Sequence, residues 1–282
     1  MPAKRGSTSR GPRSRGRPDL ELVAGTTAHY EDPAYYQKTY ADRTEDVRFY
    51  VRAAKRFGGP VLEYGCGNGR ITLAMAQEGV EVVGIDISPA MLADLRARLA
   101  DEADTVRDRV TIKRGDMRAF RARRRFPLVI CPFNAFLHLY TRQDVERFLD
   151  RVREHLAPGG RLIFDVTMPD ASELARPPAR LFRTPPFVYP EMGRVRYGER
   201  FDYDPLRQIL FVNMEFEPAS GADPFVTPLA HRQFFPQELE ALLHYNGFVI
   251  DKLVGDFFGA PEKETQTLVY EVRAAARRRS AR

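Results

Sequence analysis

Residues 61–70 read Val-Leu-Glu-Tyr-Gly-Cys-Gly-Asn-Gly-Arg, and this stretch decides how the chain folds. The apolar run Val61–Tyr64 is typical of a buried strand, and it leads directly into glycines at positions 65, 67 and 69. Glycine permits a tight turn and lets a ligand lie against the backbone. A helix is predicted next, and the N–H groups of its first turn can bind anions. A glycine-rich turn between a strand and a helix therefore predicts a site for a nucleotide-like ligand.

The chain continues with a regular alternation of strands and helices. Short apolar runs predict strands at Val80–Ile85, Val110–Lys113, Leu128–Cys131, Arg161–Val166, Phe248–Val254 and Thr267–Val272. Helical spacing predicts helices at Ile71–Glu78, from an N-cap at Ser88 to Leu99, at Arg142–Leu156 and at Pro236–Tyr245, with tyrosine-rich helical material at 29–57. This alternation indicates an α/β fold, a mostly parallel sheet with helices on both faces. Because a loop joins the last two strands, the final strand is expected to run antiparallel to its neighbours.

The alternation breaks after the fifth predicted strand. Residues 169–190 are rich in proline and are interpreted as irregular, whereas 194–217 and 228–235 read as antiparallel strands. This antiparallel β insertion, residues 167–233, leaves the carboxyl end of a strand, so it is expected to lie above that edge of the sheet. We expect it to form a lid over a substrate pocket or a homodimer element. The alternative is a surface elaboration with no role in substrate choice.

Acidic side chains follow the next two strands. Asp86 ends the second strand, where a carboxylate can accept hydrogen bonds from both hydroxyls of a ribose. Asp116 follows the third strand, where its carboxylate can accept from an adenine amino group and the Met117 amide can serve a ring nitrogen. Ligands of parallel sheets bind outside the carboxyl ends of the strands. These groups are therefore expected to converge with the glycine turn on one crevice.

As a set, these motifs resemble the class I S-adenosylmethionine (SAM)-dependent methyltransferases, and small-molecule and sugar N-methyltransferases among them. The motifs are Glu-x-Gly-x-Gly-x-Gly at 63–69, Gly-Ile-Asp-Ile-Ser-x-x-Met-Leu at 84–92, Gly-Asp-Met at 115–117 and Leu-x-Pro-Gly-Gly-x-Leu at 156–162. The resemblance implies a Rossmann-like, seven-stranded sheet with a reversed last strand, SAM as the cofactor, and one domain over residues 19–273. A dinucleotide oxidoreductase is the rival reading of the glycine turn, but its third glycine would be spaced Gly-x-Gly-x-x-Gly.

The resemblance also implies roles for individual residues. Glu63 would help hold the methionine amino group, and Gly65 and Gly67 would pass beneath the cofactor. Asp86 would bind ribose, and Asp116 with Met117 would bind adenine. The expected cofactor-binding set is completed by Tyr40, Arg43, Cys66, Ile87, Met91 and Pro132. An aromatic face such as that of Tyr40 favours a sulfonium cation, and Arg43 could pair with a carboxylate; core packing and a solvated helix charge are the alternatives.

The segment from Cys131 to His138 follows the fourth strand, which in the resembling family ends beside the transferring methyl group. His138 is the candidate base or acceptor-orienting group, because histidine titrates near neutrality. Asn134 lies four residues earlier, on the same face if the segment is helical. Tyr30, Phe133 and Asp165 are the candidate substrate-binding residues. The alternatives are a satisfied, partly buried histidine and an aspartate that only caps a turn.

The composition is that of an ordinary globular protein, with 282 residues, 43% hydrophobic and 29% charged. The net charge is +6, but residues 1–18 and 273–282 contribute +11, so residues 19–272 carry −5. The arginine-rich ends, bounded as 1–18 and 274–282, are expected to be disordered tails with at most weak, nonspecific contact to nucleic acid.

The expected location is the cytoplasm, without a membrane partner or a metal ion. The sequence contains no apolar run close to the roughly 20 residues of a membrane-spanning helix. Its two cysteines, Cys66 and Cys131, are far apart, which fits a reducing compartment better than a disulfide framework or a cysteine-ligated metal site.

The sequence therefore predicts a SAM-dependent methyltransferase that acts on a nitrogen or oxygen of a small-molecule acceptor. One alternative is a methyltransferase that acts on nucleic acid or protein and docks through the arginine-rich tails. The stretch Cys131-Pro-Phe-Asn134 is unlike the Asn/Asp-Pro-Pro-Tyr/Phe element of base N-methylating enzymes. The other alternative is a non-catalytic, SAM-binding module associated with RNA.

Overall fold

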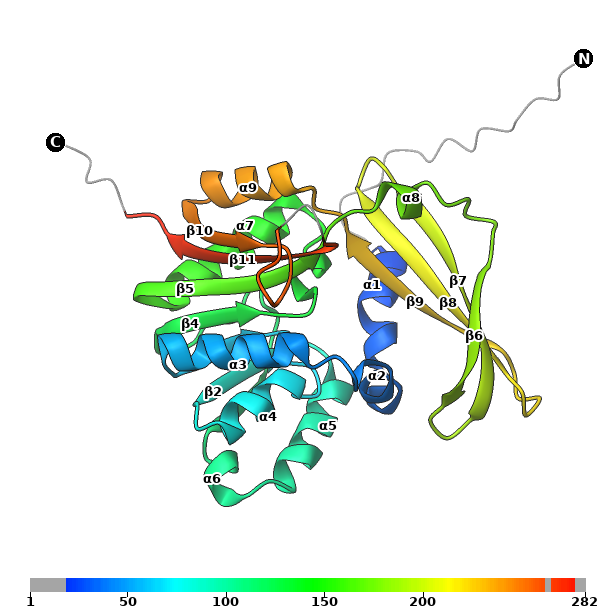
Figure 1. Ribbon diagram of the computed structural model, residues 1–282, viewed down its shortest axis with the longest axis horizontal. Coiled ribbons are helices and arrows are strands. Elements are labelled where there is room, and N and C mark those ends of the chain that lie inside the picture. Colours follow the sequence, from blue (N-terminus) through cyan, green and yellow to red (C-terminus); the bar gives the residue numbers. More distant parts are fainter. Residues whose placement is uncertain (1–18, 262–264, 277–282) are drawn as a thin grey trace, which may run out of the picture.

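A computed structural model of the protein describes residues 19–261 and 265–276. The basic tails predicted at 1–18 and at the extreme carboxyl end, 277–282, lie outside the described residues. The described part contains a seven-stranded sheet of order β10-β11-β5-β4-β1-β2-β3 and a four-stranded sheet of order β6-β7-β8-β9 (Figure 1).

The seven-stranded sheet has the topology predicted from the sequence. Its strands are β1 (Val61–Tyr64), β2 (Val82–Asp86), β3 (Val110–Arg114), β4 (Phe126–Cys131), β5 (Leu156–Thr167), β10 (Phe248–Val254) and β11 (Thr267–Ala274). β11 is antiparallel to both β5 and β10, which confirms the reversed last strand. β5 begins earlier than predicted: its register against β4 jumps from Phe126↔Leu156 to Leu128↔Arg161, so the Pro158–Gly160 turn bulges within the strand.

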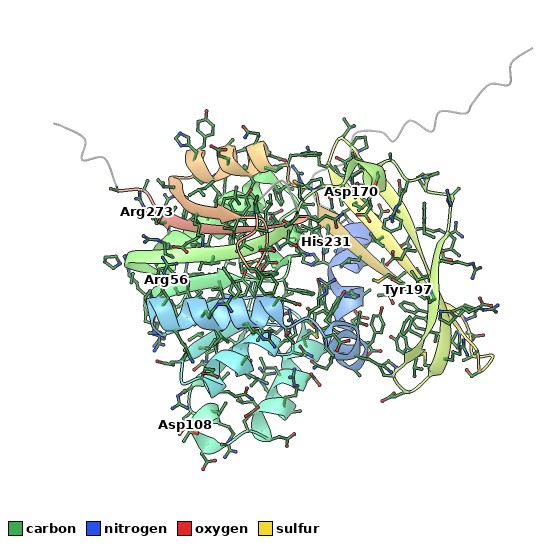
Figure 2. All side chains as sticks on the ribbon, viewed as in Figure 1. Arg56, Asp108, Asp170, Tyr197, His231 and Arg273 are labelled. Carbon is green, nitrogen blue, oxygen red and sulfur yellow. The ribbon has the colours of Figure 1, made fainter. Side chains whose placement is uncertain are left out.

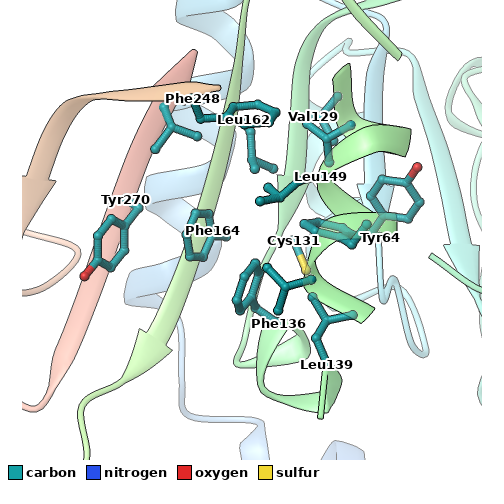
Figure 3. Close-up of a cluster of buried hydrophobic side chains, with 14 of the residues drawn as sticks. Tyr64, Val129, Cys131, Phe136, Leu139, Leu149, Leu162, Phe164, Phe248 and Tyr270 are labelled. Atoms are coloured by element: carbon teal, nitrogen blue, oxygen red, sulfur yellow. The ribbon is translucent and has the colours of Figure 1, made fainter. Parts of the chain in front are cut away.

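Helices cover both faces of this sheet, as predicted. They are α3 (Glu45–Phe57), α4 (Arg70–Gln77), α5 (Pro89–Ala100), the short α6 (Asp104–Arg107), α7 (Arg142–His155) and α9 (Pro236–Tyr245). α7 and α9 bury Phe148 and Leu243 in one core layer, part of which is drawn in Figure 3. α3 and α4 bury Tyr50 and Met75 against the opposite face. Ser88 caps α5 as expected, because its hydroxyl accepts from the Met91 amide at 3.2 Å.

The insertion forms the separate antiparallel sheet. After the short helix α8 (Ala171–Leu174) it consists of β6 (Phe182–Tyr189), β7 (Gly193–Asp204), β8 (Ile209–Pro218) and β9 (Phe225–Arg232). The sequence analysis was wrong to treat residues 169–190 as irregular throughout. β6 pairs with β7 in two pieces, with the register shifted between Thr184 and Phe187. Pro185 and Pro186 lie at that shift, and β6 is an edge strand, where proline is tolerated.

The segment before α3 lies between the two sheets (Figure 1). It comprises α1 (Leu20–Thr27), a 3-10 turn (Ala28–Tyr30) and α2 (Pro33–Tyr40). The Tyr35 ring stacks on Tyr189 of β6 with centroids 4.8 Å apart. Asp32 caps α2 and also accepts a hydrogen bond from the Tyr189 hydroxyl at 2.8 Å. These contacts fix α2 against the insertion, so α2, the insertion and the carboxyl edge of the large sheet enclose a common space.

Candidate active site

The glycine turn has the geometry that its sequence predicts. Gly65, Gly67 and Gly69 all have positive φ angles, which side chains rarely adopt. A Cβ atom at Gly65 would lie 2.8 Å from the Ala135 Cβ atom, and one at Gly69 would lie 2.1 Å from Leu95. At Gly67 the nearest atom would be the Met91 methyl group at 3.8 Å. Gly65 and Gly69 are thus required by close packing, whereas the surface over Gly67 is open, as a cradle for a ligand requires.

Asp86 lies directly against this turn. Its Oδ2 accepts from the Gly67 amide at 2.8 Å and its Oδ1 accepts from the Ser88 amide at 2.8 Å. The Asp86 carbonyl accepts from the Gly115 amide at 2.9 Å, next to Asp116. The ends of β1, β2 and β3 therefore meet in one place, which was the geometric condition for a shared cofactor crevice. Ile87, beside them, is 49% exposed.

Asp116 has a partner that the sequence analysis missed. Both of its carboxylate oxygens accept from Arg118, and the shorter contact, from Nη2 to Oδ2, is 2.7 Å. This pairing lowers the pKa of Asp116 in spite of partial burial. Arg118 also donates to Asp144 at 2.8 Å. A ligand amino group at Asp116 would therefore share the carboxylate with Arg118. Met117, the next residue, is partly buried against the core.

Glu63 is 1% exposed and accepts a hydrogen bond from the Thr72 hydroxyl at 2.6 Å. Burial raises its pKa to about 8. Cys66 and Met91 are likewise buried, behind the turn. A buried carboxyl group with a raised pKa fits a position that a cationic ligand group would occupy, since a nearby cation favours the ionised form.

The turn after β4 departs from expectation. Phe133 and Asn134 both have positive φ angles, and Asp165 accepts from their amides at 2.8 and 3.2 Å. Asp165 also accepts from the Tyr50 hydroxyl at 2.6 Å, and burial raises its pKa to about 6. Asp165 is 3% exposed and holds the turn in place. Its expected role in binding the substrate stays a prediction.

Asn134 does not share a face with His138. The segment Ala135–His138 is a 3-10 turn, and Asn134 precedes it in a left-handed conformation. The Asn134 amide group is bound to Thr167, with Nδ2 donating to Oγ1 at 3.0 Å and Oδ1 accepting from the Thr167 amide at 2.7 Å. The side chain therefore joins the ends of β4 and β5, and the residue's proposed catalytic role stays a prediction without direct geometric support.

Phe133, Tyr40 and Arg43 lie together, as expected for neighbours at the site. The Phe133 and Tyr40 rings have centroids 4.9 Å apart, and the Arg43 guanidinium lies 5.6 Å from the Phe133 ring. The Tyr40 hydroxyl lies 3.1 Å from Nε2 of His29. Pro132, just before Phe133, is buried. The aromatic group thus borders the turn that Asp165 holds.

His138 is enclosed by two tyrosines. Its Nε2 lies 2.7 Å from the Tyr30 hydroxyl, and its Nδ1 lies 3.1 Å from the Tyr140 hydroxyl. Burial lowers the pKa of His138 to about 4. Both ring nitrogens are therefore occupied and the imidazole is neutral, so Tyr30 and His138 form one hydrogen-bonded unit.

A cavity of about 660 Å³ lies between α2, the insertion and the end of β5. Tyr40, Thr167 and His231 all border it, so it adjoins the turn after β4. His231, on β9, is a residue that the sequence analysis missed; Figure 2 shows it where the insertion meets the larger sheet. Its ring lies 5.1 Å from that of His138. No sequence signal near His231 pointed to a site, because only strand pairing brings β9 to this position.

Comparison with known proteins relates the chain to methyltransferases. Residues 61–160 match the family model of a methyltransferase domain, and the described chain has the Rossmann-like fold predicted for that class. Among curated proteins, the chain is 30% identical over 128 residues to a dTDP-3-amino-3,4,6-trideoxy-alpha-D-glucopyranose N,N-dimethyltransferase of Streptomyces venezuelae. That match covers 45% of this chain and 51% of the relative. The chain therefore spans about half the length of the curated relatives it matches.

Solved structures extend the likeness of fold over most of the chain. The CcbJ methyltransferase from Streptomyces caelestis superimposes with a TM-score of 0.74 at 23% identity, covering 89% of this chain and 99% of CcbJ. The glycopeptide N-methyltransferase MtfA, in a complex with SAM, gives a TM-score of 0.58 at 27% identity, covering 84% of this chain and 91% of MtfA. The insertion is thus included in a fold that known methyltransferases share.

Proposed function

We propose that the protein transfers a methyl group from SAM to a nitrogen or oxygen of a small-molecule acceptor. The observation that carries this proposal is the meeting of the β1, β2 and β3 ends at Gly67, Asp86 and Gly115, together with a cavity of about 660 Å³ between α2 and the insertion. The matched methyltransferase domain and the relatives that are N-methyltransferases support it.

The residues at the crevice fit SAM. The open backbone at Gly67 would accommodate the cofactor, Asp86 would accept from the ribose, and Asp116 with the Met117 amide would hold the adenine. Glu63 would hold the methionine ammonium. When bound, SAM supplies an electrophilic methyl group on a sulfonium, which an acceptor attacks in line. The chain's own contribution is to orient the acceptor and to exclude water, and orientation alone accounts for several kcal/mol of the barrier, on the order of 7–11.

His231 lines the cavity, and its ring lies 5.1 Å from that of His138 in the Tyr30–His138 unit. If His231 is neutral, its imidazole can accept a hydrogen bond from an N–H or O–H group of the substrate and so direct the lone pair of that substrate atom. We place His138 behind Tyr30 as a positioning residue, because both of its nitrogens are bonded to tyrosines.

An acceptor of small size is favoured over a macromolecule. The cavity is walled by α2 and by the insertion, and a duplex or a folded protein would not enter a space of about 660 Å³. Among the residues of known placement, none lies in a helix long and apolar enough to cross a bilayer. A cytoplasmic location, a homodimer through the insertion and weak contacts of the tails with nucleic acid stay predictions.

Calorimetric titration with SAM and S-adenosylhomocysteine (SAH) tests the proposal. We expect both to bind, and we expect the SAM-loaded protein to form SAH when it is incubated with a panel of amines and phenols. A variant lacking residues 1–18 and 277–282 should form SAH at the same rate if the acceptor is small. A folded protein that binds neither SAM nor SAH would contradict the proposal.

A further inference from the structure

The cavity beside the cofactor crevice has a mainly apolar wall. Strand alternation turns Tyr197 and Phe201 of β7 toward it, and Val212 and Met214 of β8 line the same space. On the opposite side, Tyr35 of α2 closes the wall. A wall of this kind binds an apolar body by removing its surface from water.

The charged groups of the cavity wall are few. Among the residues that line it in the described chain, only Lys38, Glu173 and Glu199 are charged. Lys38 lies at an exposed position of α2, and Glu173 is paired with Arg176 at 3.4 Å. Because Arg176 neutralises Glu173, Glu199 is the carboxylate of the lining that has no basic partner within the described residues.

Glu199 differs from Glu173, the other carboxylate that lines the cavity. It accepts a hydrogen bond from the Tyr197 hydroxyl at 2.5 Å, and within the described residues it has no arginine or lysine partner. Figure 2 shows Tyr197 on the insertion, on the side toward α2. A partly buried, unpaired carboxylate between tyrosine rings is a favourable place for a cation.

Arg176 packs on the cavity residue Phe201, with its guanidinium 4.2 Å from the ring, and is paired with Glu173, whereas the arginines of β7 do not reach this space. Arg196 and Arg200 alternate with Tyr197 and Glu199 along β7, so they point to the outer face. There they pair with Glu217 and Glu215 at 2.5 and 2.6 Å. The chain contains 44 lysines and arginines, but the arginines of β7 lie away from the cavity.

This distribution of charge bears on which acceptor fits. Phosphate and pyrophosphate groups are bound through arginine forks, lysines and helix N-termini. The relative from Streptomyces venezuelae is named for a dTDP-linked sugar, which carries a pyrophosphate. The unpaired carboxylate of Glu199 disfavours a pyrophosphate beside it, because like charges repel.

We propose that the acceptor is a phosphate-free amine with an apolar body that lies against Phe201 and Met214. Its ammonium group pairs with Glu199 and gives that carboxylate a proton, which frees the nitrogen lone pair to take the methyl group. This inference rests on the proposed methyl transfer, because it assigns the cavity to the acceptor. The proposed acceptor differs from the nucleotide-linked sugars for which the relatives are named, because it carries no phosphate.

Dansylcadaverine, a fluorescent primary amine with an apolar ring system, is a suitable probe. We expect its fluorescence to rise when it binds to the SAH-loaded protein. Glu199→Gln should weaken its binding about tenfold or more, since a charge-assisted hydrogen bond is lost. Met214→Trp should abolish binding by filling the cavity. Glu217→Gln, on the outer face, is the matched control and should leave binding unchanged.

The same titrations test the amine assignment separately from the proposed methyl transfer. Thymidine diphosphate should not displace the probe. If it does, or if Glu199→Gln and Met214→Trp bind the probe as the wild type does, the amine assignment is wrong. Calorimetry with SAH on the same samples reports on the cofactor crevice alone. If the protein binds SAH but not dansylcadaverine, only the amine assignment is wrong. Loss of SAH binding in the wild type would overturn the methyl-transfer proposal itself. Circular dichroism verifies that each variant is folded.

Discussion

The Tyr30 hydroxyl lies 2.7 Å from Nε2 of His138, and this contact joins the segment before β1 to the turn after β4. The Tyr140 hydroxyl donates to the Ala230 carbonyl at 2.9 Å and also lies 3.1 Å from Nδ1 of His138. Both ring nitrogens of His138 therefore have a tyrosine hydroxyl as partner.

Replacing Tyr30 by phenylalanine should destabilise the ligand-free protein. Nε2 of His138 would be left buried without a hydrogen-bond partner, which costs about 1–3 kcal/mol. Urea denaturation measures the change in the free energy of unfolding. Tyr245→Phe is the matched control, because Tyr245 is 86% exposed and should tolerate the change. Equal stability of the two variants would show that the Tyr30–His138 contact contributes nothing.

Asp86→Ala should remove most of the affinity for SAM. The carboxylate would lose ribose hydrogen bonds worth about 1.5–3 kcal/mol each, so Kd should rise by a factor of ten or more. Calorimetry measures Kd, and circular dichroism verifies the fold. Asp108→Ala is the control, since Asp108 is exposed and lies far from the crevice (Figure 2). An unchanged Kd in Asp86→Ala would contradict the assignment of the crevice.

The core of the fold could be predicted because local signals agree with it. Apolar runs, the glycine turn and the Ser88-Pro89 helix start each mark one element. A parallel sheet with right-handed crossover connections is the arrangement that joins them. The convergence of Gly67 and Asp86 follows from that topology, because parallel strands end at one edge.

The remainder depends on contacts between distant residues. β6 was missed because Pro185 and Pro186 suggest a loop, and only pairing with β7 reveals an edge strand. Arg118 pairs with Asp116, and Asn134 is hydrogen-bonded to Thr167. A linear sequence does not specify which partner such side chains bind. His231 became a candidate only when β9 was placed beside His138.

Asp165→Asn should destabilise the turn after β4. The amide would present a donor where Asp165 now accepts from Phe133, Asn134 and Tyr50, leaving at least one of these groups unsatisfied at a cost of about 1–3 kcal/mol. Urea denaturation tests this, with Asp202→Asn on the exposed outer face of β7 as the control. If Asp165→Asn matched the control in stability, the carboxylate would not be what holds the turn.

Glu63 should make SAM binding depend on pH. Its pKa is raised to about 8 by burial, so near pH 6 the carboxyl group is mostly protonated and cannot pair with the methionine ammonium. Affinity should therefore rise with pH between 6 and 8, by at most about tenfold per pH unit, as binding releases that proton. In the ligand-free protein the sign is opposite: the folded chain retains a proton that the unfolded chain releases above its ordinary pKa, so stability should fall as pH rises toward 8. Calorimetry and urea denaturation at several pH values measure the two slopes, and Glu63→Gln should bind SAM more weakly and flatten both. Slopes that are identical in the wild type and in Glu63→Gln would place the responsible proton elsewhere and would remove Glu63 from the ammonium site.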